Sequence, residues 1–227
     1  MTTLALVVLV MAGAGQSDTV TVSELVREAQ QEVDQGWGAT DREGRVEHFR
    51  MAEAHARAAL DIAPTEPQAR WWLVVALGLR AQESPLLRRI GLVRELRVEI
   101  EHLLDEAPDH PGGHHAMGRL HAAVMRLDPL SRRLVTIVAG GGALDSASWD
   151  IAERHLRRAR ELEPDAPHHS VELARILQDR GRLEEARREA ERALAATATT
   201  PLAHWYRGWA AELLEGMEGE ARAPGRR

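Results

Sequence analysis

Prolines divide this sequence at regular places, and they constrain the fold more than any other feature. Six of the ten prolines form three Pro-x-x-Pro pairs, at residues 64–67, 108–111 and 164–167. The first proline of each pair cannot continue a preceding helix, whereas the second suits the first turn of the next helix, where a missing N–H costs nothing. A fourth junction ends at Pro201, 34 residues after Pro167. That spacing is the period of the tetratricopeptide repeat, a hairpin of two helices.

The segments between these junctions carry helix start signals. Thr21, Thr40 and Thr65 each stand three residues before a Glu or Gln, which is the pattern of a capping box. We therefore expect an all-α fold, a tetratricopeptide-like helical-hairpin solenoid. The predicted helices span residues 22–35, 41–62, 66–82, 85–106, 111–126, 147–162, 167–180, 183–196 and 201–214. The predicted domains are a signal-peptide-like segment at 1–15, the solenoid at 16–214 and a flexible C-terminal tail at 215–227.

Two repeats in the middle of the chain are longer than the 34-residue unit, because their junctions lie 44 and 56 residues apart. The second excess falls at residues 127–148, the least regular stretch, which contains Asp128-Pro129 and three glycines at 140–142. We predict a short helix and a loop there, packed on or closing one side of the solenoid. Alanines at helical spacing, as at 186, 190 and 193, predict close helix packing.

The N-terminus has the features of an export signal. Residues 4–11 are apolar and are followed by small residues at 12–15, and the run is too short to span a bilayer. No Lys or Arg precedes it, which departs from the usual signal. We expect an exported protein, periplasmic or secreted, without a transmembrane span. The alternatives are a buried N-terminal helix or a lipid-facing anchor, and a cytoplasmic protein if the segment is not a working signal.

Composition excludes several classes of function. The chain has no cysteine, and all 29 basic residues are arginine, so thiolate metal sites, cysteine nucleophiles and lysine chemistry are ruled out. With 35 acidic residues the net charge is −6, which disfavours nucleic-acid binding. The glycines at 140–142 lack the residues of a phosphate-binding loop, and no nucleophile motif is present. We predict no enzymatic activity and no cofactor.

Histidines beside the second junction are the candidate metal ligands. His114 and His121 are seven residues apart and share a helix face, and His110 lies one turn upstream. Imidazoles in this arrangement can hold a transition-metal ion. None of the His-Glu-x-x-His spacings occurs, however, and several of these residues fall in or beside a solvated loop. The prediction is therefore no metal, with His110, His114 and His121 kept as weak candidates.

Tryptophans provide the aromatic candidates for partner binding. Trp71 and Trp72 are adjacent, so on a helix one can face the core while the other points about 100° away and lines a concave groove. Trp205 and Trp209 are four residues apart and mark one helix face. That spacing, near the end of the array, favours packing over the last hydrophobic surface.

The insertions provide basic candidates. Most arginines alternate with glutamates at helical spacing, a pattern typical of a solvated outer face. Arg132 and Arg133 are less well balanced by nearby acids. If the two insertions pack together, these two would form a basic patch able to meet an acidic peptide or a lipid head group. The other predicted members of that patch are Arg88, Arg89, Arg94 and Arg97.

Residues 71–194 resemble the regulator of microtubule dynamics family, tetratricopeptide-like proteins with an extended middle repeat. The similar features are the junction at 105–111, the His115-Ala-Met-Gly118-Arg119 element, the Arg132-Arg133 insertion and the segments 152–164 and 181–194. In the family a Trp normally follows the His-x-x-Gly-Arg element, whereas Leu120 follows here. The resemblance implies the fold and a helix contact for His115.

The family also bears on the partner. Animal members are associated with microtubules and mitochondrial membranes, and at least one is credited with lipid binding. The alanine-rich, arginine-only composition and signal-like N-terminus favour a bacterial, exported member, so the resemblance implies binding of an extended or apolar partner and not the microtubule role. We predict a scaffold that recognises a protein segment in its concave groove; the alternative is a lipid or apolar-ligand carrier using the same groove. The candidate groove residues are Trp71, Trp72, His115, Arg119, Arg132 and Arg133.

Overall fold

A computed structural model describes residues 21–130, 132–133, 146–197 and 199–222, so the predicted export signal lies outside the described residues. Within the described ranges the chain is helical, with turns and no strand, as predicted. The helices are α1 (Val22–Gly38), α2 (Arg42–Ile62), α3 (Pro67–Gln82), α4 (Leu86–Glu106), α5 (Pro111–Met125), α7 (Trp149–Leu162), α8 (Pro167–Asp179), α9 (Leu183–Ala195) and α10 (Pro201–Arg222). Residues 129–130 and 132–133 are also helical, as predicted for a short helix in the insertion at 127–148, whereas residues 134–145 of that insertion lie outside the described part.

Prolines and caps set the helix starts. The second proline of each pair begins α3, α5 and α8, as the junction pattern predicts. The capping box of Thr21 and Glu24 is also present. The two other predicted boxes are wrong by one residue: Asp41 caps α2 by accepting from the Gly44 N–H at 2.8 Å, and Glu66 caps α3. A carboxylate cap directly before the first helical residue outcompetes the threonine upstream of it.

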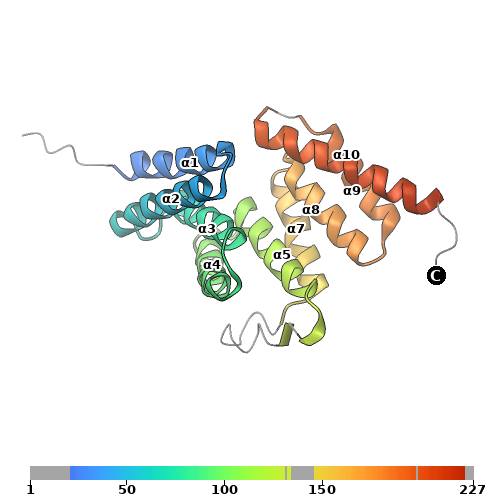
Figure 1. The fold of residues 1–227 in the computed structure, drawn as a ribbon, viewed down its shortest axis with the longest axis horizontal. Coiled ribbons are helices and arrows are strands. Elements are labelled where there is room, and N and C mark those ends of the chain that lie inside the picture. Colours follow the sequence, from blue (N-terminus) through green and yellow to red (C-terminus); the bar gives the residue numbers. More distant parts are fainter. Residues whose placement is uncertain (1–20, 131, 134–145, 198, 223–227) are drawn as a thin grey trace, which may run out of the picture.

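Successive helices pair as antiparallel hairpins, α1 with α2, α3 with α4, α5 with α7 and α8 with α9, and α10 packs on α9 and α8. The first helices of successive hairpins also touch one another, α1 with α3, α3 with α5, α5 with α8 and α8 with α10. These first helices therefore line the inner side of a curved solenoid. Figure 1 shows the arc, with the start of α10 close to the end of α1. There the rings of Trp37 and Trp205 lie 6.4 Å apart between centroids.

Small residues fill the helix contacts, as the alanine spacing predicts. Fully buried alanines occur on the second helices at positions 52, 56, 59, 152, 159, 186, 190 and 193. A single described residue, Gly181, has a positive φ, of 72°, in the turn between α8 and α9. The N–H of Arg182 donates to the Leu177 carbonyl at 2.8 Å across that turn. A left-handed glycine just past the helix end gives this type of cap.

The predicted tail at 215–227 is wrong in its first part. Helix α10 continues to Arg222, and Met217 is buried with Leu213 and Leu214 against the core of α7, α8 and α9. Glycines at 216 and 219 lower helix propensity, but the packing of Met217 overrides that weak preference. Residues 223–227 lie outside the described part. Among the described helices, none combines the length and apolarity needed to cross a membrane.

Candidate functional groove

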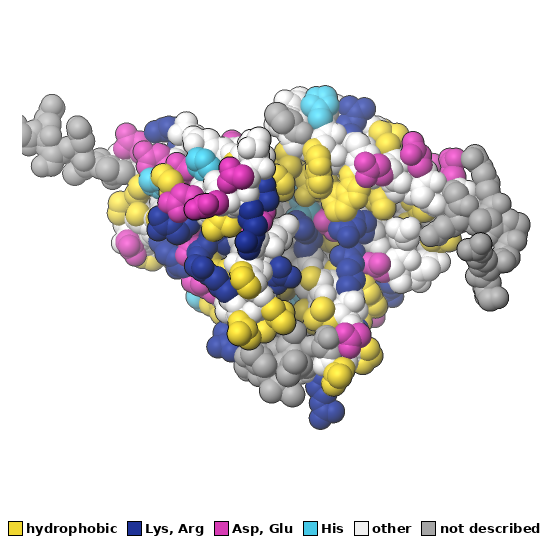
Figure 2. Space-filling view, viewed as in Figure 1, with side chains coloured by type: hydrophobic (Ala, Val, Ile, Leu, Met, Phe, Trp, Pro, Cys, Tyr) yellow, Lys and Arg dark blue, Asp and Glu magenta, His cyan; other side chains and the backbone are white. Residues whose placement is uncertain are grey.

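The inner side of the arc is hollowed. Figure 2 shows a hollow between the α1–α4 half and the α8–α10 half, with hydrophobic side chains along its α10 edge and basic side chains on both walls. Trp37 of α1 and Trp205 of α10 lie where these two helices approach each other, and they are 48% and 52% exposed. The predicted burial of Trp205 is therefore wrong. The solenoid curves enough to bring α1 next to α10, so Trp205 faces another tryptophan and solvent.

Trp205 belongs to a ring cluster on α10. Its ring lies 4.8 Å from that of Tyr206 and 5.1 Å from that of Trp209. Tyr206 is buried, and Trp209 packs against the same small core, as predicted for Trp209. The guanidinium of Arg175, from α8, lies 4.5 Å above the Trp209 ring, which is cation–π distance. We call Trp37, Trp205, Tyr206 and Trp209 the aromatic edge.

A buried carboxylate lies beside the aromatic edge. Glu172 on α8 is 1% exposed, and its two oxygens lie 3.2 Å from Arg119 of α5 and 3.3 Å from Arg175. Both arginine side chains remain partly exposed, at 40% and 31%. One carboxylate therefore serves two guanidinium groups, which leaves a local excess of positive charge. Arg119, predicted from the sequence, lies at this position.

The two adjacent tryptophans on α3 mainly join helices. The Trp71 ring covers Gly112 so closely that a Cβ there would be 2.7 Å from it, and it contacts the His110 ring at 5.4 Å. Trp72 packs on the opposite side, against the clusters that include Val33 of α1 and Leu77 of α3. Both are half-buried. The two neighbours on α3 therefore pack against different helices, Trp71 against α5 and Trp72 against α1.

Two arginines of the predicted basic patch, Arg132 and Arg89, bind backbone carbonyl groups at the ends of helices. Arg132 donates to the Met125 and Leu127 carbonyls at 2.7 and 3.0 Å, at the end of α5. Arg89 does the same for α3, donating to the carbonyls of Ala81 and Ser84, both at 2.9 Å. Terminal carbonyls of a helix have no partner inside the helix, so a guanidinium that satisfies them has a structural task. Arg133 is exposed next to Arg132.

The histidines separate into two groups, and the predicted set of His110, His114 and His121 is not brought together. His110 caps α5 by accepting from the Gly113 N–H at 3.1 Å. His114 shares a 2.9 Å hydrogen bond with His155 of α7, and the ring of His121 is parallel to that of His155 at 6.4 Å. His114 thus faces α7, because α7 is its hairpin partner. Burial lowers the pKa of His155 to about 4.

His115 points to α8 and meets two histidines that the sequence analysis missed. Its Nδ1 lies 3.0 Å from Nδ1 of His169, and its ring lies 4.9 Å from that of His168. The helix contact predicted for His115 is therefore present. Burial lowers the pKa of His115 well below 6.5 and that of His168 to about 3. A sequence signal was available: two adjacent histidines follow the second proline of a junction in both repeats, at 114–115 and 168–169.

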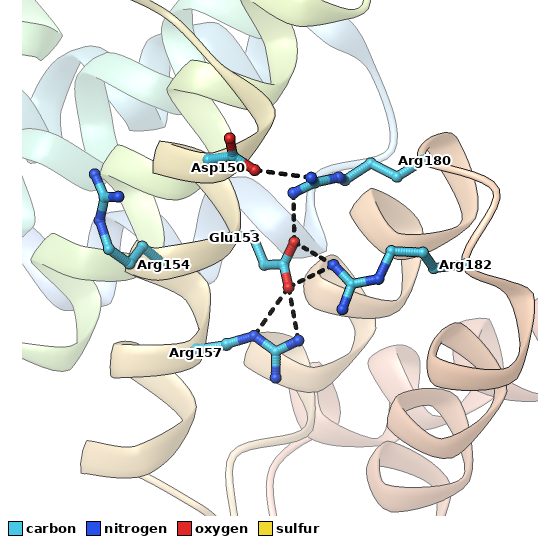
Figure 3. A pocket seen from close by; sticks show the side chains of 6 residues that line it. All are labelled: Asp150, Glu153, Arg154, Arg157, Arg180 and Arg182. Atoms are coloured by element: carbon cyan, nitrogen blue, oxygen red, sulfur yellow. Dashed lines mark hydrogen bonds and ion pairs between the residues drawn. The ribbon is translucent and has the colours of Figure 1, made fainter.

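A charged pocket lies between α7 and the turn that joins α8 to α9. Figure 3 shows Glu153 of α7 held by three guanidinium groups that converge on it, from Arg157, Arg180 and Arg182. The shortest distances are 2.6, 2.5 and 2.7 Å. Burial opposes ionisation of Glu153, but hydrogen bonds from Arg157 and Arg182 outweigh it and lower its pKa. The pocket of about 240 Å³ is open and lined only by charged residues, so it joins repeats and does not suit an apolar ligand.

Glu153→Gln is expected to lower the free energy of unfolding by about 1 to 2 kcal/mol, because three guanidinium groups lose their shared anion while remaining partly exposed to water. Urea unfolding followed by circular dichroism measures the change. Glu191→Gln, on the exposed face of α9, is the matched control and should change stability by less than about 0.5 kcal/mol. Equal effects of the two substitutions would contradict a role for Glu153 in joining the repeats.

Known proteins support this architecture. The sequence model of the family described as regulator of microtubule dynamics protein 1-3 matches residues 10–218. Among solved structures, the fold is similar to the crystal structure of a thermophilic TPR protein from Thermus thermophilus. That similarity has a TM-score of 0.54 and 18% identity, and it covers 86% of this chain and 91% of the other. No curated protein sequence matches the chain significantly.

Proposed function

Because the chain belongs to the regulator of microtubule dynamics family and has a tetratricopeptide-type fold, we propose that it is a non-enzymatic binding protein that holds a segment of a protein partner in its concave groove. The family match confirms the resemblance inferred from residues 71–194 and extends it over most of the chain. Tetratricopeptide-like solenoids use their concave surfaces for binding. We therefore expect the partner to bind in the groove.

The aromatic edge is the observation that carries this proposal. Trp37 and Trp205 leave about half of their surface in solvent, although a large apolar ring gains most from burial. Tryptophan, tyrosine and arginine are also the residues that dominate the energy of protein interfaces. Here two half-exposed tryptophans stand next to Tyr206, Trp209 and Arg175.

The charges beside the aromatic edge indicate the chemistry of the segment. Arg119 and Arg175 share one buried carboxylate, so a second carboxylate from a partner would complete their pairing. The favoured ligand is a peptide with an aromatic or aliphatic side chain next to an acidic one. A lipid is the second candidate. The hollow in Figure 2 is open and carries charges on both walls, which suits a peptide better than an acyl chain.

Trp205→Ala is expected to weaken binding of the natural partner by at least tenfold, because truncating a central interface tryptophan removes about 2 kcal/mol or more. The partner is captured from an extract of the source cells with the tagged chain, identified, and its affinity measured by calorimetry with the purified proteins. Leu87→Ala is the control, since Leu87 is 85% exposed on α4, away from the aromatic edge.

The outcomes separate the two candidates. A partner that binds the Leu87→Ala chain normally and the Trp205→Ala chain weakly supports the groove. A partner that binds all three chains equally places binding elsewhere. Native mass spectrometry of the purified chain is the arm for the alternative: a co-purified lipid that is lost in Trp205→Ala would favour the carrier.

A further inference from the structure

We propose that His115, His168 and His169 form a binding site for a divalent transition-metal ion of the Zn²⁺ class. His115 comes from the second turn of α5, and His168 and His169 come from the first turn of α8; α5 and α8 are the inner helices of successive hairpins. One ring nitrogen of each lies within 4.8 Å of those of the other two. Three imidazole nitrogens with a fourth position open are an established coordination set for zinc.

The spacing of the nitrogens fits a bound ion after small movements. Zinc lies 2.0 to 2.1 Å from an imidazole nitrogen, so two ligands of a tetrahedral site are about 3.3 Å apart. Nδ1 of His115 and Nδ1 of His169 are 3.0 Å apart, close to that separation. His168 is partly exposed, whereas His115 and His169 are buried, so its ring is the one that would move to complete the site. The exposed side of His168 also gives an ion a way in from solvent.

A carboxylate occupies the position expected behind a metal-bound histidine. Nε2 of His169 lies 3.1 Å from an oxygen of Glu163, on the opposite edge of the ring from Nδ1. With an ion on Nδ1, the Nε2–H would donate to Glu163, and this contact fixes the tautomer and the ring orientation. Such carboxylate–histidine pairs are the usual support of histidine ligands in metal sites.

Positive charges near the three histidines oppose binding of a cation, whereas two nearby carboxylates favour it. The N-terminal end of α8 carries a partial positive charge, and Arg119 of α5 adds a full one. Glu172 of α8 pairs with Arg119, and Glu163 contributes a carboxylate directly beside His169. Burial lowers the pKa of His115 and of His168, so both rings are neutral at pH 7 and keep a lone pair for a metal.

A hydrogen bond between His115 and His169 would by itself explain why these two side chains lie together, without a metal ion. The pair of His114 and His155 has the same kind of contact, at 2.9 Å, and the third ring beside it, that of His121, lies parallel to His155 at 6.4 Å. At His115 a third imidazole converges and a carboxylate stands behind one ring. An ion held there would connect α5 to α8 and so stiffen the inner wall of the groove, with its fourth position open to water or to a partner side chain.

Zinc chloride titrated into the untagged, chelator-treated full chain tests the site. Calorimetry should show saturable binding of one ion per chain, and the melting temperature should rise by about 5 to 10 °C at saturation. Cobalt in place of zinc should give the visible absorption of a tetrahedral site. Absence of saturable binding of one equivalent would overturn the proposal.

Three variants locate the ion. His168→Asn should abolish the rise in melting temperature, and Glu163→Gln, at a half-exposed side chain, should lower zinc affinity by about tenfold while the chain stays folded. His155→Asn is the matched control in the other histidine group and should bind zinc normally. Loss of binding in His155→Asn with retention in His168→Asn and Glu163→Gln would refute this site.

Discussion

Replacing Gly118 with valine is expected to lower the free energy of unfolding by about 3 to 4 kcal/mol. A Cβ at this position would lie 2.7 Å from Cγ of Leu156 and 3.0 Å from the backbone oxygen of Ala152. Leu156 and Ala152 are fully buried in α7, so neither can move aside without shifting the helix. Overpacking by single methyl groups costs about 1 to 3 kcal/mol, and valine adds three carbons.

Gly91→Ala on α4 is the matched control, because nothing lies within 4 Å of a Cβ built there. Alanine should raise the free energy of unfolding at that position by about 0.5 to 1 kcal/mol, since a glycine inside a helix loses more backbone entropy on folding. Urea unfolding of the three chains measures both changes. A Gly118→Val chain as stable as the unmodified one would mean that α5 and α7 are not in close contact.

The sequence predicted those parts of the fold that depend on short, local patterns, and the element around Gly118 is one example. The His115-Ala-Met-Gly118-Arg119 element was identified by its resemblance to a family, and the structure supplies the reason for the glycine: α5 and α7 touch there. Helix boundaries were predictable because prolines and caps act locally, within a few residues of chain. The end of α10 was not predictable in this way, because the burial of Met217 depends on α7, α8 and α9.

The candidate site was predicted less completely, for a physical reason. His114 and His115 are adjacent on α5 and point about 100° apart, so they meet different helices, α7 and α8. The sequence shows which faces histidines share, but not which helices lie opposite them. The exposure of Trp205 likewise depends on the curvature of the whole solenoid, which brings α1 to α10.

Acidification from pH 7 to pH 5 is expected to lower the free energy of unfolding of the metal-free chain by about 2 to 4 kcal/mol. Burial holds the pKa of His168 at about 3 in the folded chain, against 6.5 when unfolded, and it lowers that of His115 as well. The unfolded state therefore binds more protons below pH 6.5, and stability falls as the pH falls. At pH 5, 1.5 pH units below 6.5, one such histidine accounts for about 2 kcal/mol. His155, whose pKa burial lowers to about 4, acts in the same direction.

Thermal unfolding at pH 7, 6 and 5 in the presence of a chelator measures this loss, which corresponds to about 5 to 15 °C in melting temperature. His168→Asn should weaken the pH dependence, whereas His204→Asn, at an exposed position of α10, should leave it unchanged. The two carboxylates that pair with the guanidinium and imidazole groups described above act at lower pH. Glu153 and Glu163 have lowered pKa values, so the stability that they contribute is lost only below their unfolded value of 4.5. A stability that stays constant from pH 7 to pH 5 would therefore contradict the burial of neutral histidines between α5 and α8.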